Sequence, residues 1–164
     1  MALKIREMDL KDLMGVISII KDEMHCTDNS SDIYDRLTKI YRDENYTTFV
    51  AEQDGSVIGF AGIVRSLVFE REGKLLRVLA LAVKTAYEGS GIDTQLMGRV
   101  EDYALERGAH AIVVSSGLKR NDFHAFCTKM GYEKSGYSFV KPLPSERKQS
   151  YNALFTPIPH REDM

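Results

Sequence analysis

The feature that most constrains the fold is the stretch 75–109, which reads LLRVLALAVKTAYEGSGIDTQLMGRVEDYALERGA. It places an apolar strand, a turn containing Gly89, Ser90 and Gly91, and an amphipathic helix in direct succession. The first N–H groups of a helix lack partners inside it, and the helix dipole adds partial positive charge at the same end. This succession therefore predicts an anion site, suited to phosphate, where the helix begins.

The rest of the chain predicts alternating strands and helices. Apolar alternation favours strands at 3–8, 47–52, 56–69, 75–83, 110–115 and 132–141. Helical spacing favours helices at 9–24, 30–41, 92–107 and 122–130, the first capped by Asp9 and the second opened by Ser30, Ser31 or Asp32. Asp54-Gly55 is a strong hairpin signal, and a second hairpin is expected to turn at 70–74. The order β-α-α-β-β-β-α-β-α-β indicates an α/β (α+β) fold with a mixed sheet and helices packed on it.

The length of 164 residues suits one domain and provides enough chain for a hydrophobic core. We expect this domain at 1–143. The segment 144–164 follows as a polar C-terminal tail, which either adds a strand at 151–156 or is mobile.

The composition narrows the choice of partners. A net charge of −2 gives no global basic field, so we expect neither nucleic acid nor an anionic membrane surface as a partner. No run approaches the roughly 20 apolar residues of a membrane span, and the N-terminal MALKIREMDL lacks the apolar core of a signal peptide, so we expect a cytoplasmic protein. The two cysteines are too few for a disulfide framework, and the four histidines show no zinc spacing, so no metal site is expected.

Two segments carry a resemblance to a known family. The run LALAVKTAYEGSGIDTQLM resembles motif A of the GNAT superfamily of N-acetyltransferases, in which an apolar strand precedes a glycine-containing turn and an amphipathic helix. SSGLKRNDFHAFCTKMGYEKSGYSFVKPL resembles the C-terminal half of the same fold. The similarity covers roughly 3–143 and implies a mixed, mostly antiparallel central sheet flanked by helices.

The resemblance implies an acetyl-CoA site and places residues in it. The main chain of Leu81 to Val83 is expected to face the pantetheine arm and to polarise the thioester carbonyl, and the turn that follows is expected to hold the diphosphate. Arg120 stands where the family approaches the cofactor, and His124 matches a family histidine with a structural role as its alternative. The cofactor-binding positions are Leu81, Ala82, Val83, Glu88, Gly89, Ser90, Gly91, Ile92, Asp93, Arg120 and His124.

The resemblance also suggests catalytic groups. Cys127 occupies the position where the family often has a tyrosine that protonates the departing thiolate. It is therefore a candidate general acid, with an acetylated ping-pong intermediate and a small structural side chain as alternatives. Glu70 and Glu72 lie in the hairpin turn before the catalytic strand and are candidate general bases, or plain solvated charges.

The implied function is transfer of an acetyl group from acetyl-CoA to a primary amine of a small molecule or peptide, by direct attack in a ternary complex. The range 21–44 holds seven acidic against four basic residues, which favours a cationic acceptor but also suits an ordinary wetted helix face. Tyr34, Tyr41, Tyr46 and Tyr137 are candidates to line an acceptor pocket, with ordinary core and rim packing as the alternative.

Glu88 and Asp93 depart from the motif, because the family has Arg or Gln at the first position and Gly or Ala at the second. The alternative is therefore a degenerate relative that binds an acyl-CoA, or nothing, and serves as a regulatory or interaction module. A P-loop protein is excluded, since the chain lacks the required Gly-Lys-Ser/Thr. A homodimer is expected only by analogy with the superfamily.

Overall fold

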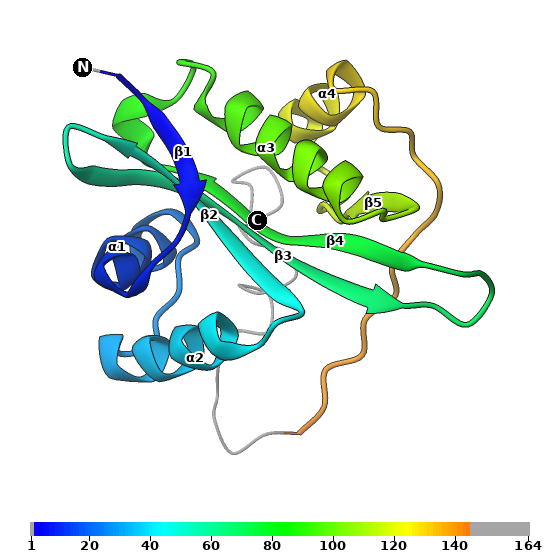
Figure 1. Ribbon diagram of the computed structural model, residues 1–164, viewed down its shortest axis with the longest axis horizontal. Helices are drawn as coiled ribbons and strands as arrows, with labels where there is room; N and C mark the ends of the chain where they lie inside the picture. Colours follow the sequence, from blue (N-terminus) through cyan, green and yellow to red (C-terminus); the bar gives the residue numbers. More distant parts are fainter. Residues whose placement is uncertain (1, 145–164) are drawn as a thin grey trace.

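The computed structural model describes residues 2–144, and its helices lie on both faces of a central sheet (Figure 1). The elements in chain order are β1 (Lys4–Glu7), the 3-10 turn η1 (Leu10–Asp12), α1 (Leu13–Glu23), α2 (Ser30–Arg42), β2 (Tyr46–Gln53), β3 (Ser56–Leu67), β4 (Lys74–Val83), η2 (Thr85–Tyr87), α3 (Ile92–Glu106), β5 (Ala111–Val114) and α4 (Asn121–Lys129).

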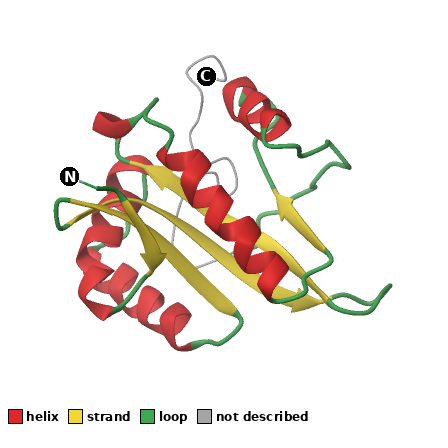
Figure 2. Ribbon diagram, turned by 45° about the horizontal axis from the view of Figure 1, so that its top comes forward, coloured by secondary structure: helices red, strands yellow, loops and turns green. Residues whose placement is uncertain are grey.

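The sheet confirms the predicted mixed, mostly antiparallel architecture. Its five strands lie in the order β1-β2-β3-β4-β5. Figure 2 shows this sheet, in yellow, between its flanking helices. Neighbours from β1 to β4 are antiparallel, whereas β5 pairs parallel to β4 because α3 makes the crossover between them. The β2–β3 hairpin turns at Asp54 and Gly55, both of which have positive φ values of 53° and 79°. A type I′ hairpin turn requires this backbone geometry, which explains the strength of the Asp-Gly signal.

Each face of the sheet has its own core, because successive strand residues point to opposite sides. Phe49 and Ala51 belong to the cluster under α3, together with Leu96 and Val100 of that helix. The intervening Val50 belongs to the cluster under α1 and α2, whose other members are Met8, Leu13, Val16, Ile17, Ile19, Ile33, Leu37, Val57 and Phe60.

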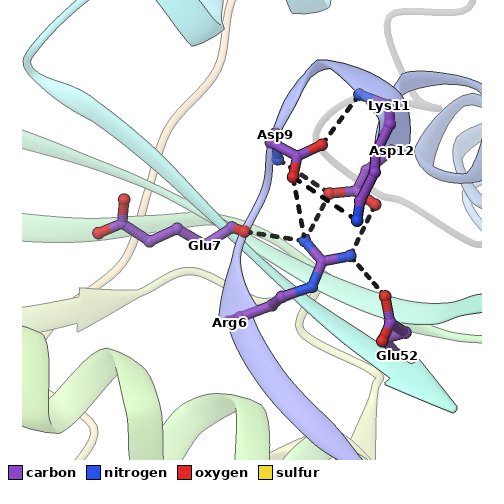
Figure 3. Close-up of polar contacts among 6 residues, drawn as sticks. All are labelled: Arg6, Glu7, Asp9, Lys11, Asp12 and Glu52. Atoms are coloured by element: carbon purple, nitrogen blue, oxygen red, sulfur yellow. Dashed lines mark hydrogen bonds and ion pairs between the residues drawn. The ribbon is translucent and has the colours of Figure 1, made fainter. Parts of the chain in front are cut away.

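A partly buried ion-pair network fixes the start of the α1 segment to the sheet (Figure 3). Arg6 donates to both carboxylate oxygens of Asp12, at 2.7 and 2.9 Å, and to Glu52 on β2 at 2.7 Å. Asp9 caps η1 in a capping box, since Asp12 accepts from the Asp9 N–H at 2.8 Å and Asp9 accepts from Lys11. The hydrogen bonds from Arg6 hold the pKa of Asp12 below its ordinary value even though burial opposes this shift.

Two sequence predictions about local structure need correction. The N-cap of α2 is Asn29, whose side chain accepts from the Asp32 N–H at 2.9 Å, and not Ser30, Ser31 or Asp32. The strand expected at 132–141 is absent, and 133–144 is exposed and outside any helix or strand. Alternation describes which faces a strand would present, but a strand also needs a neighbour, and within residues 2–144 no strand pairs with this segment. The strand considered at 151–156 lies outside the described residues.

Candidate functional site

The parallel strands β4 and β5 separate where the predicted thioester-binding residues begin. Pairing between them covers Leu75 to Val78 on β4 and ends at Val114 on β5. β4 continues to Val83. Within the described residues, the last five residues of β4 therefore have a strand neighbour on the β3 side alone.

The register with β3 decides which main-chain groups of β4 are free. The Lys84 N–H donates to the Ile58 carbonyl at 2.8 Å, so the pair Ile58–Lys84 is a hydrogen-bonded pair of the antiparallel ladder. Such pairs alternate along the strand, which turns the N–H and C=O of Ala82 toward β3 and those of Leu81 and Val83 toward the unpaired edge. Of the three predicted main-chain positions, Leu81 and Val83 are thus oriented for binding, and Ala82 contributes its side chain to the opposite face of the sheet.

The strand leads through η2 into the N-terminus of α3, as the sequence predicted. Gly91 is the N-cap, with a left-handed backbone at φ 83°. The first intrahelical bond runs from the Gln95 N–H to the Gly91 carbonyl at 3.1 Å. The N–H groups of Ile92 and Asp93 precede it and have no partner within the helix by position. They form a donor site at the end of the strand that carries Leu81 and Val83.

The two acidic departures from the motif lie differently. The Asp93 carboxylate accepts from the Thr94 N–H at 2.8 Å, so it occupies one donor of the first helical turn. Glu88 is exposed and follows η2, where its own N–H donates to Thr85 at 3.1 Å. Asp93 therefore acts partly as a helix cap, whereas Glu88 contributes a solvated charge beside the turn.

An apolar cavity lies on the other face of the same strand, under α1 and α2. Its volume is about 250 Å³, and its walls include Ile20, Met24, Leu37, Ile40, Phe60 and Leu79. The β3–β4 register shifts between Gly62 and Ile63, so that Leu79 has no partner residue in β3. This bulge, together with the neighbouring Ala80, forms the part of the wall that leads into the candidate thioester-binding residues.

The acidic residues of 21–44 do not collect in this cavity. Asp28 is the one of the seven that lines it, and its carboxylate lies 3.1 Å from the Arg36 guanidinium, which also lines it. Glu23 instead accepts from the Thr85 N–H at 3.2 Å and contacts the Thr85 hydroxyl at 2.8 and 3.1 Å. That contact joins the end of α1 to the loop between β4 and α3, and no sequence signal indicated it.

The helix α4 packs on the α3 face of the sheet. Its Phe126, and Met130 and Tyr132 just after the helix, pack against the same core cluster as Leu81 and Val83. Cys127 is half-buried in this helix, and desolvation raises the pKa of its thiol while the nearby Arg120 charge opposes the shift. The thiol is therefore protonated at neutral pH, which suits a proton donor better than a nucleophile.

The other predicted groups near α4 have structural partners. His124 Nε2 donates to the Gly117 carbonyl at 2.8 Å and so ties the β5–α4 loop to the helix. Arg120 stacks on Phe123, with the guanidinium 4.7 Å from the ring centroid, and burial lowers its pKa. Tyr132, part of the Gly-Tyr pair but not selected from the sequence, donates to Glu101 of α3 at 2.9 Å. Burial, reinforced by that bond, raises the pKa of Tyr132.

The structure does not bring Glu70 and Glu72 to this site. Both are exposed in the β3–β4 hairpin turn, which joins the Lys74 end of β4. A rise of about 3.3 Å per residue puts Val83 about 30 Å away along the strand. The geometry therefore offers no support for either glutamate as the general base, because proximity in the chain to β4 is not proximity to its C-terminal end.

Two further observations concern the described residues alone. Within 2–144, no group of three or more His, Cys, Asp or Glu side chains is arranged to hold a metal ion. None of the helices in that range has the length and apolar character needed to cross a membrane.

Comparison with known proteins agrees with this arrangement. The family model described as "Acetyltransferase (GNAT) family" matches residues 13–132. The aminoalkylphosphonate N-acetyltransferase of Salmonella typhimurium is 28% identical over 101 residues, which are 62% of this chain and 66% of that enzyme. The match thus spans just under two thirds of that relative's length.

Solved structures show the same fold at low sequence identity. A transcriptional regulator from Bacillus halodurans superimposes with a TM-score of 0.79 at 19% identity, covering 87% of this chain and 100% of that one. The structure of AAC(6')-Iy with the bisubstrate analogue CoA-S-monomethyl-acetylneamine gives 0.77 at 16% identity, covering 88% of this chain and 100% of that one.

Proposed function

Because the chain belongs to the acetyltransferase (GNAT) family, we propose that it transfers an acetyl group from acetyl-CoA to a primary amine by direct attack in a ternary complex. By family, the chain is an acyltransferase. One observation carries the specific proposal. Two sets of hydrogen-bond donors follow one another along the chain: the unpaired main-chain edge at Leu81 and Val83, and then the free N–H groups at the start of α3.

The two donor sets have different tasks. The N–H groups of Ile92 and Asp93, with the flanking turn at Gly89 to Gly91, bind the diphosphate, because they present partial positive charge without a side-chain cation. The main chain of Leu81 and Val83 aligns the pantetheine arm, and a strand N–H polarises the thioester carbonyl. Arg120 and His124 support this site from the α4 side, the latter through its bond to Gly117.

Acetyl transfer then needs one bond to form and one to break. The amine nitrogen of the acceptor attacks the thioester carbon, the C–S bond breaks, and the excess proton on nitrogen leaves to solvent. Cys127 protonates the departing thiolate and regains its proton from water. The raised pKa of Cys127 keeps that proton in place before transfer.

The proposal is tested first by binding. Calorimetric titration with CoA is expected to show one site, and pantetheine, which lacks the diphosphate, is expected to bind at least about tenfold more weakly. No heat with millimolar CoA, or equal affinity for the two ligands, contradicts the proposed site. Release of thiol from acetyl-CoA across a panel of amines then tests the transfer itself.

A second candidate function is supported by Asp93, whose carboxylate already occupies the Thr94 N–H. A degenerate relative that binds acyl-CoA without transferring the acyl group would bind CoA but release no thiol with any amine, and one whose diphosphate site is blocked by its own carboxylate would bind no CoA. The two measurements above separate this regulatory module from the enzyme.

A further inference from the structure

The cavity under α1 and α2 limits the size of whatever occupies it. An apolar cavity of about 150 Å³ is large enough for benzene. The present volume of about 250 Å³ therefore accommodates one ring with a short side chain, or an aliphatic chain of comparable size. A molecule of several sugar rings exceeds this volume and would have to extend out of the cavity.

The walls of the cavity also limit the charge of the molecule that it can bind. Ile20, Leu37 and Phe60 are among the apolar lining residues, and the charged ones are Asp28 and Arg36, which lie 3.1 Å apart. Their charges cancel, so the lining carries no net charge to attract a polycation or to hold a phosphonate.

The position of the cavity connects it to acetyl transfer. Leu79 and Ala80 line it and directly precede Leu81, the first residue of the proposed thioester-binding edge. Adjacent strand residues are about 3.3 Å apart, so an amine at this end of the cavity lies within a few ångströms of that edge. Leu79 is 52% exposed, which shows that the cavity reaches the surface beside β4.

We infer that the acceptor is a small monoamine with a compact apolar body, either one aromatic ring or a short aliphatic chain, bound in this cavity with its nitrogen toward Leu79 and Ala80. This inference rests on the proposed acetyl transfer and specifies its substrate class. It differs from the cationic acceptor that the charge of 21–44 favoured, because Asp28 is the one acidic residue of that range in the cavity lining and it pairs there with Arg36.

The apolar lining has a consequence for the protonation of the amine. Burial in such surroundings disfavours the ammonium form, so the cavity selects the neutral amine that can attack a thioester. The site then needs no adjacent carboxylate as general base, which agrees with the remote position of Glu70 and Glu72. Activity at low amine concentration is expected to rise tenfold per pH unit below the pKa of the free amine.

The first experiment compares amines with acetyl-CoA, using thiol release. In the series from ethylamine to butylamine, kcat/KM is expected to rise about fourfold per methylene, as each buried CH₂ contributes to binding. 2-Phenylethylamine is expected to exceed spermidine, neamine and an aminoalkylphosphonate by at least about tenfold. The last compound represents the substrate class in the Salmonella relative's name.

The second experiment fills the cavity. A Cβ at Gly62 would lie 3.8 Å from Ala80 and 4.0 Å from Phe60, so G62V fits the backbone while its methyl groups occupy cavity space. It is expected to lower kcat/KM for 2-phenylethylamine at least about tenfold, through KM, with CoA affinity unchanged. The control S66V adds the same side chain to an exposed position of the same strand and is expected to leave both values unchanged.

The outcomes separate the two proposals. Absence of CoA binding overturns the proposed function itself. Normal CoA binding with preference for spermidine, neamine, a phosphonate or a peptide amine overturns the apolar acceptor and leaves acetyl transfer intact. An unaltered KM for 2-phenylethylamine in G62V, with the variant folded as judged by its CoA affinity, also overturns the inference, because the amine is then bound elsewhere.

Discussion

Gly91 offers the sharpest test of the proposed diphosphate site. Its φ of 83° lies in the left-handed region, and a Cβ built on it would meet nothing within 4 Å. The cost of G91A therefore comes from backbone conformation and not from a clash. For an L-residue this conformation costs about 1–2 kcal/mol, which corresponds to about 2–8 °C in Tm for a chain of this size.

A matched control exists at the other end of α3. Gly108 also has a positive φ, 66°, and its added Cβ would likewise meet nothing within 4 Å. The helix between the two glycines has 15 residues, so their surroundings are about 22 Å apart. G108A is therefore expected to lose the same stability as G91A without touching the start of the helix.

The two variants are compared by urea unfolding and by calorimetric titration with CoA. Both are expected to lose about 1–2 kcal/mol of unfolding free energy. G91A alone is expected to weaken CoA binding about tenfold, the equivalent of one hydrogen bond to a charged group at about 1.5 kcal/mol. Equal CoA affinity in the two variants, at equal loss of stability, would refute the reasoning that the α3 N-terminus binds the diphosphate.

Three further predictions concern single charges and the thiol. E88R replaces an exposed negative charge beside the same turn. It is expected to tighten CoA binding about fivefold at low ionic strength and hardly at all in 1 M salt. Unchanged affinity at low salt would show that Glu88 faces away from the phosphates. C127A is expected to lower kcat about 100-fold with CoA affinity retained. In the unmodified protein, the loss of kcat at alkaline pH should occur above the ordinary thiol pKa of 9.0. An unaffected kcat in C127A contradicts the role of Cys127 as general acid. D12N breaks the pair with Arg6 and is expected to cost about 2–3 kcal/mol of unfolding free energy at pH 7. The pKa of Asp12 in the folded protein lies below 3.8, so the stability difference between D12N and the unmodified protein should be complete above pH 3.8. It should vanish as the pH falls through the folded pKa. A difference that persists at pH 2 would mean that packing and not charge is responsible.

The sequence predicted the elements well where a local signal specifies local geometry. Asp54-Gly55 marks a turn that needs positive φ at both positions, and Gly91 marks the start of α3, which begins at Ile92 as expected. The strand prediction at 132–141 was wrong because an alternating pattern within one segment does not show whether another strand is available to pair with it. Asn29 was missed as a cap since Ser30, Ser31 and Asp32 are equally good cap residues by type.

The candidate site divides in the same way. The resemblance to the family motif pointed to Leu81, Ala82 and Val83 together. Which of their main-chain groups face β3 depends on the register with β3, which the sequence of a single strand does not contain. The charge count on the acceptor side is limited for a related reason. A charge count over 21–44 sums residues that α1 and α2 direct to different places, so Glu23 reaches Thr85 while Asp28 pairs with Arg36.

Under the proposed function, the arrangement of β4 explains how one strand would serve two substrates at separate binding sites. Leu81 and Val83 turn their main chain to the unpaired edge and their side chains toward the α3 core, while Ala80 and Ala82 face the core under α1 and α2. The bulge at Leu79 is the point at which this alternation is interrupted, and the cavity wall and the thioester-binding edge meet there. An extra residue in a strand re-aims the residues beside it, so under the proposed function this bulge would bring an amine bound on one face toward a thioester bound along the edge. We therefore propose that the two sites vary independently, with acceptor preference set by the residues under α1 and α2 and carrier binding set by the main chain and the start of α3.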